Sequence, residues 1–225
     1  MNEKRIFDII FSFIGLVVLF PVFIVLSIII VLDSPGGIFF RGERVGQYGK
    51  SFKIYKFRSM LKDCEGKGKW NVGDKDSRIT KVGHFLRKSK LDELPQLINV
   101  LKGDMSFVGP RPELQYYVNM FTDREKIILS LKPGITDWAS ITNFEQFKGF
   151  TKAEDPDAYY LKYVRPLKLK LQMYYVKHHS LKDDFTCILW TVYKVVTRSR
   201  KLPERIQRIV DRYNKELEKA KNNEQ

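Results

Sequence analysis

Residues 90–113 read KLDELPQLINVLKGDMSFVGPRPE, and this stretch decides both the local fold and the candidate chemistry. Apolar residues recur there at i, i+3, i+4 and i+7, which predicts a short amphipathic helix. They are Leu94, Leu97, Ile98 and Leu101. Asp92 is expected to be the N-cap, and Pro95 is tolerated because first-turn amides have no intrahelical partner. Gly103 marks the C-terminal end of the predicted helix.

The same stretch places adjacent carboxylates, Asp92 and Glu93, shortly before an arginine, Arg111, that two prolines hold in a stiff turn. A helix N-terminus keeps an aspartate ionised, and its free amides can hold phosphate oxygens. Carboxylates attack phosphoryl groups, a second carboxylate helps to hold Mg²⁺, and an arginine binds phosphate with two nitrogens. The residues alone leave two readings open, an acid pair that only caps a helix and one that acts on phosphate.

The overall charge favours a polyanionic partner. Forty Lys and Arg residues against 26 Asp and Glu give a formal net charge of +14 and a pI of about 9.6. Nucleic acid, an anionic membrane surface and a phosphorylated substrate all fit this charge. Lys56 and Arg58 leave a predicted strand and could face lipid phosphate, substrate phosphate or solvent, and their aromatic neighbours also allow a nucleic-acid surface.

Cysteine and histidine usage points to a reducing compartment. Cys64 and Cys187 belong to no paired pattern, which favours the cytosol. The histidines, His84, His178 and His179, show no ligand spacing with cysteines or acids, so no zinc site is expected.

Residues 6–32 are almost purely apolar and predict a membrane anchor. At about 1.5 Å per residue such a helix reaches roughly 40 Å, more than the roughly 30 Å hydrocarbon core of a bilayer. The run is too long for a signal peptide, and no small-residue cleavage site follows it. We therefore expect the segment to stay on the mature protein.

Pro21 lies in the middle of this anchor and should kink or break its helix. Both flanks are cationic, with Lys4 and Arg5 before the segment and Arg41 and Arg44 after it. The positive-inside rule then places both ends in the cytosol. A re-entrant helix that bends at Pro21 fits this pattern, and a tilted spanning helix with an ordinary proline kink is the alternative.

Beyond a turn cluster at residues 33–37, the pattern predicts an α/β domain that is mostly helical with one small β-hairpin. The hairpin strands are expected at residues 38–40 and 52–57. Helices are expected at residues 79–88, 114–131, 157–178 and 181–196. Residues 62–77 read as a loop, and 181–196 reads equally as an interfacial amphipathic helix or a core helix.

These elements divide the chain into three parts. Residues 1–35 form the expected re-entrant membrane anchor, residues 36–200 a compact catalytic domain with interfacial helices, and residues 201–225 a charged tail. The tail reads as a solvated or frayed helix.

Five ordered motifs resemble those of the bacterial sugar transferases, the monotopic polyprenyl-phosphate phosphoglycosyl transferase family. They are KFRSM at 56–60, LDELPQL at 91–97, NVLKGDMS at 99–106, VGPRPE at 108–113 and KPGITDWA at 132–139. The resemblance covers roughly residues 3–197. With one hydrophobic segment, the chain is similar to the small members, typified by the enzyme of bacterial N-glycan assembly.

The resemblance implies a reaction. A sugar 1-phosphate moves from a UDP-sugar donor to undecaprenyl phosphate through a covalent aspartyl-phosphosugar intermediate, releasing UMP, with Mg²⁺ as cofactor. Asp92 matches the family's nucleophile and Glu93 its partner acid, and both are assigned to the metal. Arg111 matches the arginine that contacts phosphate, and Pro21 the helix-breaking proline. Further residues assigned to substrate or phosphate binding are Lys56, Arg58, Arg87 and Asp104.

The implied setting is the cytosolic face of a bacterial inner membrane, with membrane lipids as partners and no nucleic acid. A homo-oligomer is left open, and a catalytically silent scaffold of a glycan-assembly complex is the alternative function. The chain departs from the family at Asp137, where glycine is frequent, and at residues 140–144, which read SITNF where many members have QVNGR. The sugar of the donor is therefore not predicted.

Overall fold

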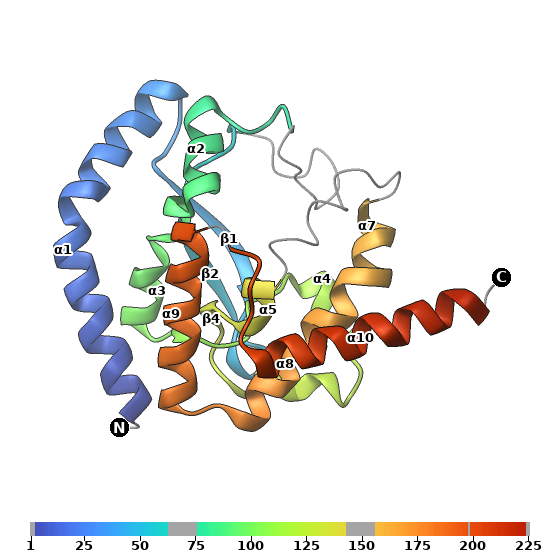
Figure 1. The fold of residues 1–225 in the computed structure, drawn as a ribbon. Coiled ribbons are helices and arrows are strands. Elements are labelled where there is room, and N and C mark those ends of the chain that lie inside the picture. Colours follow the sequence, from blue (N-terminus) through green and yellow to red (C-terminus); the bar gives the residue numbers. More distant parts are fainter. Residues whose placement is uncertain (1–2, 63–75, 143–155, 198, 224–225) are drawn as a thin grey trace.

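The computed structural model describes residues 3–62, 76–142, 156–197 and 199–223 (Figure 1). Over these ranges the protein is mostly helical, with two small sheets of two strands each. The predicted class, mostly helical with a small hairpin, is confirmed. Most of the loop expected at 62–77 lies outside the described residues, as does Cys64.

The first helix, α1 (Glu3–Asp33), continues through Pro21 without interruption and bows along one side of the molecule (Figure 1). The expected helix-break-helix is therefore not observed. A proline removes one backbone donor and crowds the preceding turn, and a long helix can accommodate both by curvature. α1 packs on α2 (Lys81–Ser89) and α3 (Gln96–Lys102). By length and composition it is long and apolar enough to cross a membrane.

The first turns of α1 are fixed to the rest of the chain by polar contacts. The guanidinium of Arg5 donates to the carbonyls of Val100 at 2.6 Å and Leu101 at 2.8 Å. The buried carboxylate of Asp8 accepts from the Ser106 hydroxyl at 3.0 Å. Because these groups belong to the end of α3 and to β3 (Ser106–Val108), the N-terminal end of α1 is held against the domain.

The last turn of α1 is fixed as well. The buried guanidinium of Arg58 donates to the carbonyls of Ile30 at 3.2 Å and Ser34 at 2.6 Å. The Asp33 carboxylate accepts from the Val82 amide at 3.2 Å. Arg58 thus supplies a donor to the Ser34 carbonyl just beyond the helix end and a second donor to the Ile30 carbonyl, which also accepts from the Ser34 amide.

The predicted hairpin is present as β1 (Phe39–Val45) and β2 (Ser51–Phe57), an antiparallel pair in which Phe39 faces Phe57 and Val45 faces Ser51. A 3₁₀ turn at Gln47–Gly49 joins the strands. The Val45 amide donates to the Glu113 carbonyl at 2.9 Å. The hairpin is thereby joined to the chain that follows the Pro-Arg-Pro turn.

A second, parallel sheet was not predicted. It pairs β3 with β4 (Gly134–Thr136), and Gly109 immediately follows the first strand. A Cβ placed on Gly134 would lie 2.1 Å from the Gly109 nitrogen. Only glycine permits this approach of two backbones, which positions the Pro-Arg-Pro turn.

The single helix expected at residues 114–131 is wrong. The chain forms α4 (Gln115–Val118) and then a separate 3₁₀ helix, η3 (Glu125–Ser130). Thr122 and Glu125 explain the new start, because each side chain accepts a hydrogen bond from the other's backbone amide, at 2.8 and 3.4 Å. This reciprocal capping box begins a second helix.

The C-terminal half supplies the main core and is helical where helices were expected. Its elements are α5 (Trp138–Thr142), α7 (Pro156–Tyr159), the π-helical turn η4 (Tyr160–Val164), α8 (Arg165–His178), α9 (Leu181–Thr197) and α10 (Glu204–Asn223). The tail is helical, as expected, but α10 is not solvated on all sides. Ile206, Val210 and Tyr213 are buried in the same cluster as Trp138 and Tyr175, so one face of α10 belongs to the core.

Candidate active site

The acid pair lies in a turn between two helices. Lys90 adopts a left-handed conformation with φ of 61° and ends α2, and a 3₁₀ turn, η2 (Leu91–Glu93), follows before α3 begins. The N-cap of α3 is Pro95, and no side chain caps either element. The predicted N-cap role of Asp92 is therefore wrong, because Asp92 lies within the 3₁₀ turn and α3 begins only at Gln96.

Asp92 is buried, with 7% of its surface exposed. Its Oδ1 atom has no hydrogen-bond partner among the residues that the structure describes. Burial raises the pKa of this carboxyl, which the charge of Lys56 partly offsets. An unsatisfied buried acceptor costs about 1–3 kcal/mol. Asp92 caps neither η2 nor α3, so no capping hydrogen bond offsets this cost. The interpretation of the acid pair as a simple helix cap is therefore excluded.

Glu93 is fully engaged. Its carboxylate accepts hydrogen bonds from Nη1 of Arg111 at 3.0 Å, from Nη2 of the same side chain, and from the Lys56 ammonium at 3.2 Å. Burial by itself would raise the pKa of Glu93, but the charges of Arg111 and Lys56 outweigh it and hold this pKa well below its usual range. The two neighbouring acids therefore have opposite environments. Glu93 holds the two cations in place, whereas Asp92 Oδ1 has no hydrogen-bond partner among the described residues.

Arg111 is fixed at both its backbone and its side chain. Its amide donates to Asp137 Oδ2 at 3.0 Å, and its Nη1 donates to the Ile135 carbonyl at 2.9 Å. Asp137 is itself buried and also accepts from the side chain of Gln172 and the amide of Ser140. Asp137, which marks a departure from the family pattern, thus braces the turn that presents Arg111.

The structure brings some of the predicted binding residues together. Lys56 and Arg111 both contact Glu93. Arg87 donates through Nε to the Ser59 hydroxyl at 3.0 Å, and its charge acts on Asp92.

Two predicted binding residues lie elsewhere. Arg58 is held by carbonyls at the end of α1. Asp104 follows the far end of α3 from Asp92 and contacts Asn99 at 3.2 Å and Lys102 at 3.9 Å.

Gln96 was missed by the sequence analysis. It is fully buried, and neither its Oε1 nor its Nε2 has a hydrogen-bond partner among the described residues. It stands four positions after Asp92, the spacing that places two side chains on one side of a helical path. A polar residue beside the apolar stripe is the signal that could have found it.

An open pocket of about 180 Å³ lies beside this site. It is lined by Arg44, Ile54, Lys56, Arg111, Pro112, Glu113 and Leu114. Glu113 is paired with Lys168, whose pKa is raised, against burial, by that carboxylate. Arg44 had been noted only as a flanking charge of the anchor, yet it shares the pocket with two residues that contact Glu93. The pocket is therefore strongly basic.

The residues around Asp92 offer a limited set of metal ligands. The described residues contain no group of three or more His, Cys, Asp or Glu side chains arranged for a metal. Asp92 Oδ1 has no hydrogen-bond partner among the described residues, so it could bind a metal ion without losing a contact. Glu93 could bind one only while it also holds Arg111 and Lys56. Mg²⁺ commonly takes one or two carboxylates and completes its shell with substrate phosphate and water. The acid pair fits this limited role.

Comparisons with known proteins identify the family of this chain. The family profile described as "Bacterial sugar transferase" matches residues 1–198, so the chain belongs to the bacterial sugar transferase family. It is 36% identical over 198 residues to the UDP-N-acetylgalactosamine-undecaprenyl-phosphate N-acetylgalactosaminephosphotransferase of Aeromonas hydrophila, covering 86% of this chain and 44% of that protein.

Two Bacillus subtilis proteins are also similar. A putative undecaprenyl-phosphate N-acetylgalactosaminyl 1-phosphate transferase is 49% identical over 118 residues, covering 52% of this chain and 66% of its own length. The uncharacterized sugar transferase EpsL is 37% identical over 199 residues, covering 87% of this chain and 88% of its own. The chain thus spans less than two thirds of the first two relatives and most of EpsL.

Proposed function

We propose that this protein transfers a sugar 1-phosphate from a UDP-sugar to undecaprenyl phosphate through a covalent intermediate on Asp92. The observation that carries the proposal is the buried Asp92 carboxylate, whose Oδ1 has no partner among the described residues, beside a Glu93–Arg111 ion pair. The Aeromonas relative, which is named for a reaction of this kind, supports the same class of donor and acceptor.

The mechanism uses the different environments of the two acids. Asp92 attacks the sugar-bearing phosphorus, the bond from that phosphorus to the bridging oxygen breaks, and UMP leaves. Undecaprenyl phosphate then attacks the same phosphorus and frees the carboxylate. Poor solvation strengthens Asp92 as a nucleophile, and Glu93 keeps Arg111 and Lys56 in place beside it.

Arg111 is the residue that recognises phosphate in this proposal. Its fork already binds a carboxylate with two nitrogens, and the same geometry suits phosphate oxygens. Mg²⁺, with Asp92 and Glu93 as its protein ligands, would neutralise charge on the diphosphate when bound. Burial and the brace from Asp137 lower the cost of ordering Arg111 for this task.

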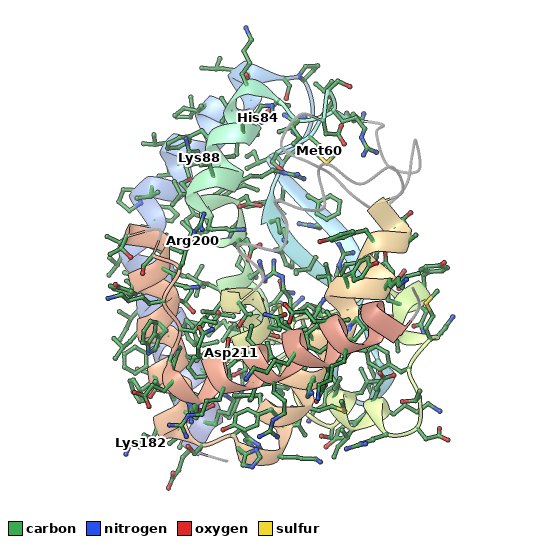
Figure 2. All side chains as sticks on the ribbon, turned by 45° about the vertical axis from the view of Figure 1, so that its right-hand side comes forward. Met60, His84, Lys88, Lys182, Arg200 and Asp211 are labelled. Atoms are coloured by element: carbon green, nitrogen blue, oxygen red, sulfur yellow. The ribbon has the colours of Figure 1, made fainter. Side chains whose placement is uncertain are left out.

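A monotopic attachment belongs to the same proposal, with both ends of α1 on the cytosolic side of a bacterial inner membrane. A helix of 31 residues that spanned a bilayer would put its ends on opposite faces. Here Arg5 and Asp8 at one end, and Asp33 and Ser34 at the other, contact the same domain. Figure 2 places His84 and Lys88 of α2 near one end of the molecule and Lys182 of α9 near the other, and α1 runs between these levels.

The outer surface of the domain supports this attachment. α1 exposes an apolar face along most of its length. α9 exposes a stripe beside it, and Phe185 on that stripe lies 5.0 Å from Phe7 of α1 between ring centroids. The stripe consists of Phe185, Leu189, Val192, Tyr193 and Val196. The opposite face of α9 is buried, so the helix is both a core helix and, in this proposal, an interfacial one.

The nucleophile assignment is tested by Asp92→Asn. Incubated with a panel of UDP-sugars, undecaprenyl phosphate and Mg²⁺, the wild-type chain should release UMP and the variant should release none above background. Asp123→Asn is the matched control, because Asp123 is an exposed aspartate paired only at the surface with Lys126. Substantial turnover by Asp92→Asn would remove Asp92 from the mechanism.

The scaffold alternative and the membrane topology have separate tests. A folded wild-type chain that releases no UMP from any donor would favour the catalytically silent scaffold. For topology, single cysteines at Glu3 and Gly37, both exposed, are labelled in sealed vesicles after Cys64 and Cys187 are replaced. Labelling of both from one face supports the monotopic form, and labelling from opposite faces indicates a spanning helix.

A further inference from the structure

The basic pocket has two walls of different origin. One wall is a face of the hairpin, on which alternate residues of the strands, Gly42 and Arg44 on β1 and Ile54 and Lys56 on β2, lie on the same side. The other wall is the segment at residues 111–114. Glycine at position 42 matters here, because a Cβ there would lie 2.4 Å from the ring of Phe40 and 3.2 Å from Nη1 of Arg44.

The cations of this pocket differ in their partners. Lys56 and Arg111 share one carboxylate, that of Glu93, as their ion-pair partner. Arg44 forms no carboxylate ion pair among the described residues, and its Nη1 donates to the carbonyl of Glu43 at 2.6 Å. Burial and the charge of Arg111 lower the pKa of Arg44, and the charge of Glu113 offsets this only in part. Arg44 is therefore a half-buried cation that faces a second arginine, and the nearby acid that acts on it, Glu113, is already bound to Lys168.

Two arginines that repel each other across a pocket are stabilised when an anion lies between them. A group with two linked phosphates can meet both, because Arg111 takes the phosphate next to Asp92 and Arg44 takes the phosphate beyond it. Ile54 and Leu114 add apolar walls to the same pocket. The pocket lies between the hairpin and residues 111–114, whereas α1 packs on α2, α3 and β3. A soluble donor therefore fits this pocket better than a lipid phosphate that arrives along α1.

We infer that Arg44 binds the nucleotide-side phosphate of the diphosphate donor, the phosphate that departs with the nucleoside. The inference rests on the proposed function and adds a residue to it. When Asp92 bonds to the sugar-bearing phosphorus, the bond to the bridging oxygen breaks and its electron pair stays on that oxygen. The departing nucleoside monophosphate gains one negative charge there. Arg44 stabilises this developing charge, while Arg111 stays with the phosphoryl group that is transferred.

Direct binding tests the inference without turnover. The full chain in detergent is titrated calorimetrically with UMP, UDP and uridine. Arg44→Ala and Arg44→Gln should weaken UMP and UDP binding about 10- to 100-fold, leave uridine binding unchanged, and be partly rescued in Arg44→Lys. Arg41→Ala is the matched control, because Arg41 lies on the other face of the same strand and stacks on Tyr55 at 4.8 Å.

Kinetics separate the two sources of phosphate. Loss of Arg44 should raise KM for the UDP-sugar and leave KM for a short polyprenyl phosphate within about threefold, since lost rim charges change affinity little. Four results would each overturn the inference. Two concern the variants: UMP affinity of Arg44→Ala within threefold of wild type, or an equal loss of UMP affinity in Arg41→Ala. The others are an effect of Arg44 loss confined to the polyprenyl phosphate, and no UMP binding by the wild type. Arg44-dependent UMP binding by a wild type that transfers no sugar phosphate would instead refute the proposed function alone.

Discussion

Arg58 and Arg111 belong to two different sequence motifs, KFRSM at the end of β2 and VGPRPE at the Pro-Arg-Pro turn. Both side chains are substantially buried, and both had been assigned to phosphate. They differ in what faces them. Arg111 binds a carboxylate, Glu93, whereas Arg58 binds backbone carbonyls at the end of α1.

This difference separates a binding arginine from a structural one. A carboxylate and a phosphate present the same charge and similar oxygen geometry, so Arg111 can share its fork with a substrate. The carbonyls of Ser34 and Pro35 lie beyond the helix and accept from Arg58, so Arg58 can release them only at the cost of this end of α1. The counter-group of a buried arginine therefore indicates its role more directly than its burial does.

Removal of Arg111 should produce the largest effect on chemistry. Arg111→Ala is expected to lower kcat/KM for the UDP-sugar about 10²- to 10³-fold, the range found when a charge-stabilising donor is lost. Arg111→Lys should recover little, because an ammonium cannot replace a fork with two contacts. Initial rates of UMP release measure both. If Arg111→Ala retained more than a third of the wild-type value, the contrast between the two arginines would fail.

Removal of Arg58 should act on folding instead. Arg58→Ala removes the donor to the carbonyls of Ser34 and Pro35, which should cost about 2–4 kcal/mol of stability. The measurement is a denaturation midpoint in detergent, with UMP release per folded molecule expected within about threefold of wild type at low temperature. Arg41→Ala is again the control. A variant of normal stability with lost turnover would place Arg58 in the site after all.

The sequence predicted the local elements because their signals are local. The hairpin and the helices α2, α3, α8 and α9 follow from short-range periodicity. The pairing of β3 with β4 could not be predicted, because each strand has only three residues and the two strands lie far apart in the sequence. The buried face of α10, with Ile206 and Val210, was hidden among many charged neighbours.

The candidate site was predicted for the same kind of reason and only in part. Asp92, Glu93 and Arg111 lie close together in sequence, and the structure keeps them together. Whether a motif residue faces an acid or a helix end depends on tertiary packing, so Arg58 could not be told from Arg111 by spacing. Gln96 stayed unnoticed because an unsatisfied amide is defined only by its surroundings.

The rate of UMP release should depend on pH through the ionisation of Asp92 and not of Glu93. Burial raises the pKa of Asp92, and Arg111 and Lys56 lower that of Glu93. Single-turnover UMP release should therefore fall about tenfold per pH unit below a midpoint that lies above the ordinary aspartate value of about 3.9. A midpoint at or below that value would contradict the assignment.

Stability supplies an independent measure of the same shift. A carboxyl with a raised folded pKa favours folding most below its unfolded pKa, and this contribution is lost as pH rises through the folded pKa. Asp92→Asn cannot ionise, so its melting temperature should lie above that of the wild type at neutral pH. The difference between the two melting temperatures should become smaller in acid. An equal gap at both pH values would show that burial of the charge is not the cause.

Substitution of Gln96 should have the smallest effect, and it tests whether a buried residue serves the reaction and not the stability of the fold. Gln96→Leu keeps the volume roughly constant and removes two polar atoms that have no partner among the described residues, so stability should be unchanged or raised. If the amide is kept for a phosphate oxygen or for Asp92 during reaction, UMP release should fall about three- to tenfold. Gln172→Leu is the contrast, because Gln172 braces Asp137 at 3.0 Å and its loss should lower stability. Melting temperatures and initial rates on both variants decide the point, and a Gln96→Leu protein with reduced stability and normal turnover would make Gln96 an ordinary core residue.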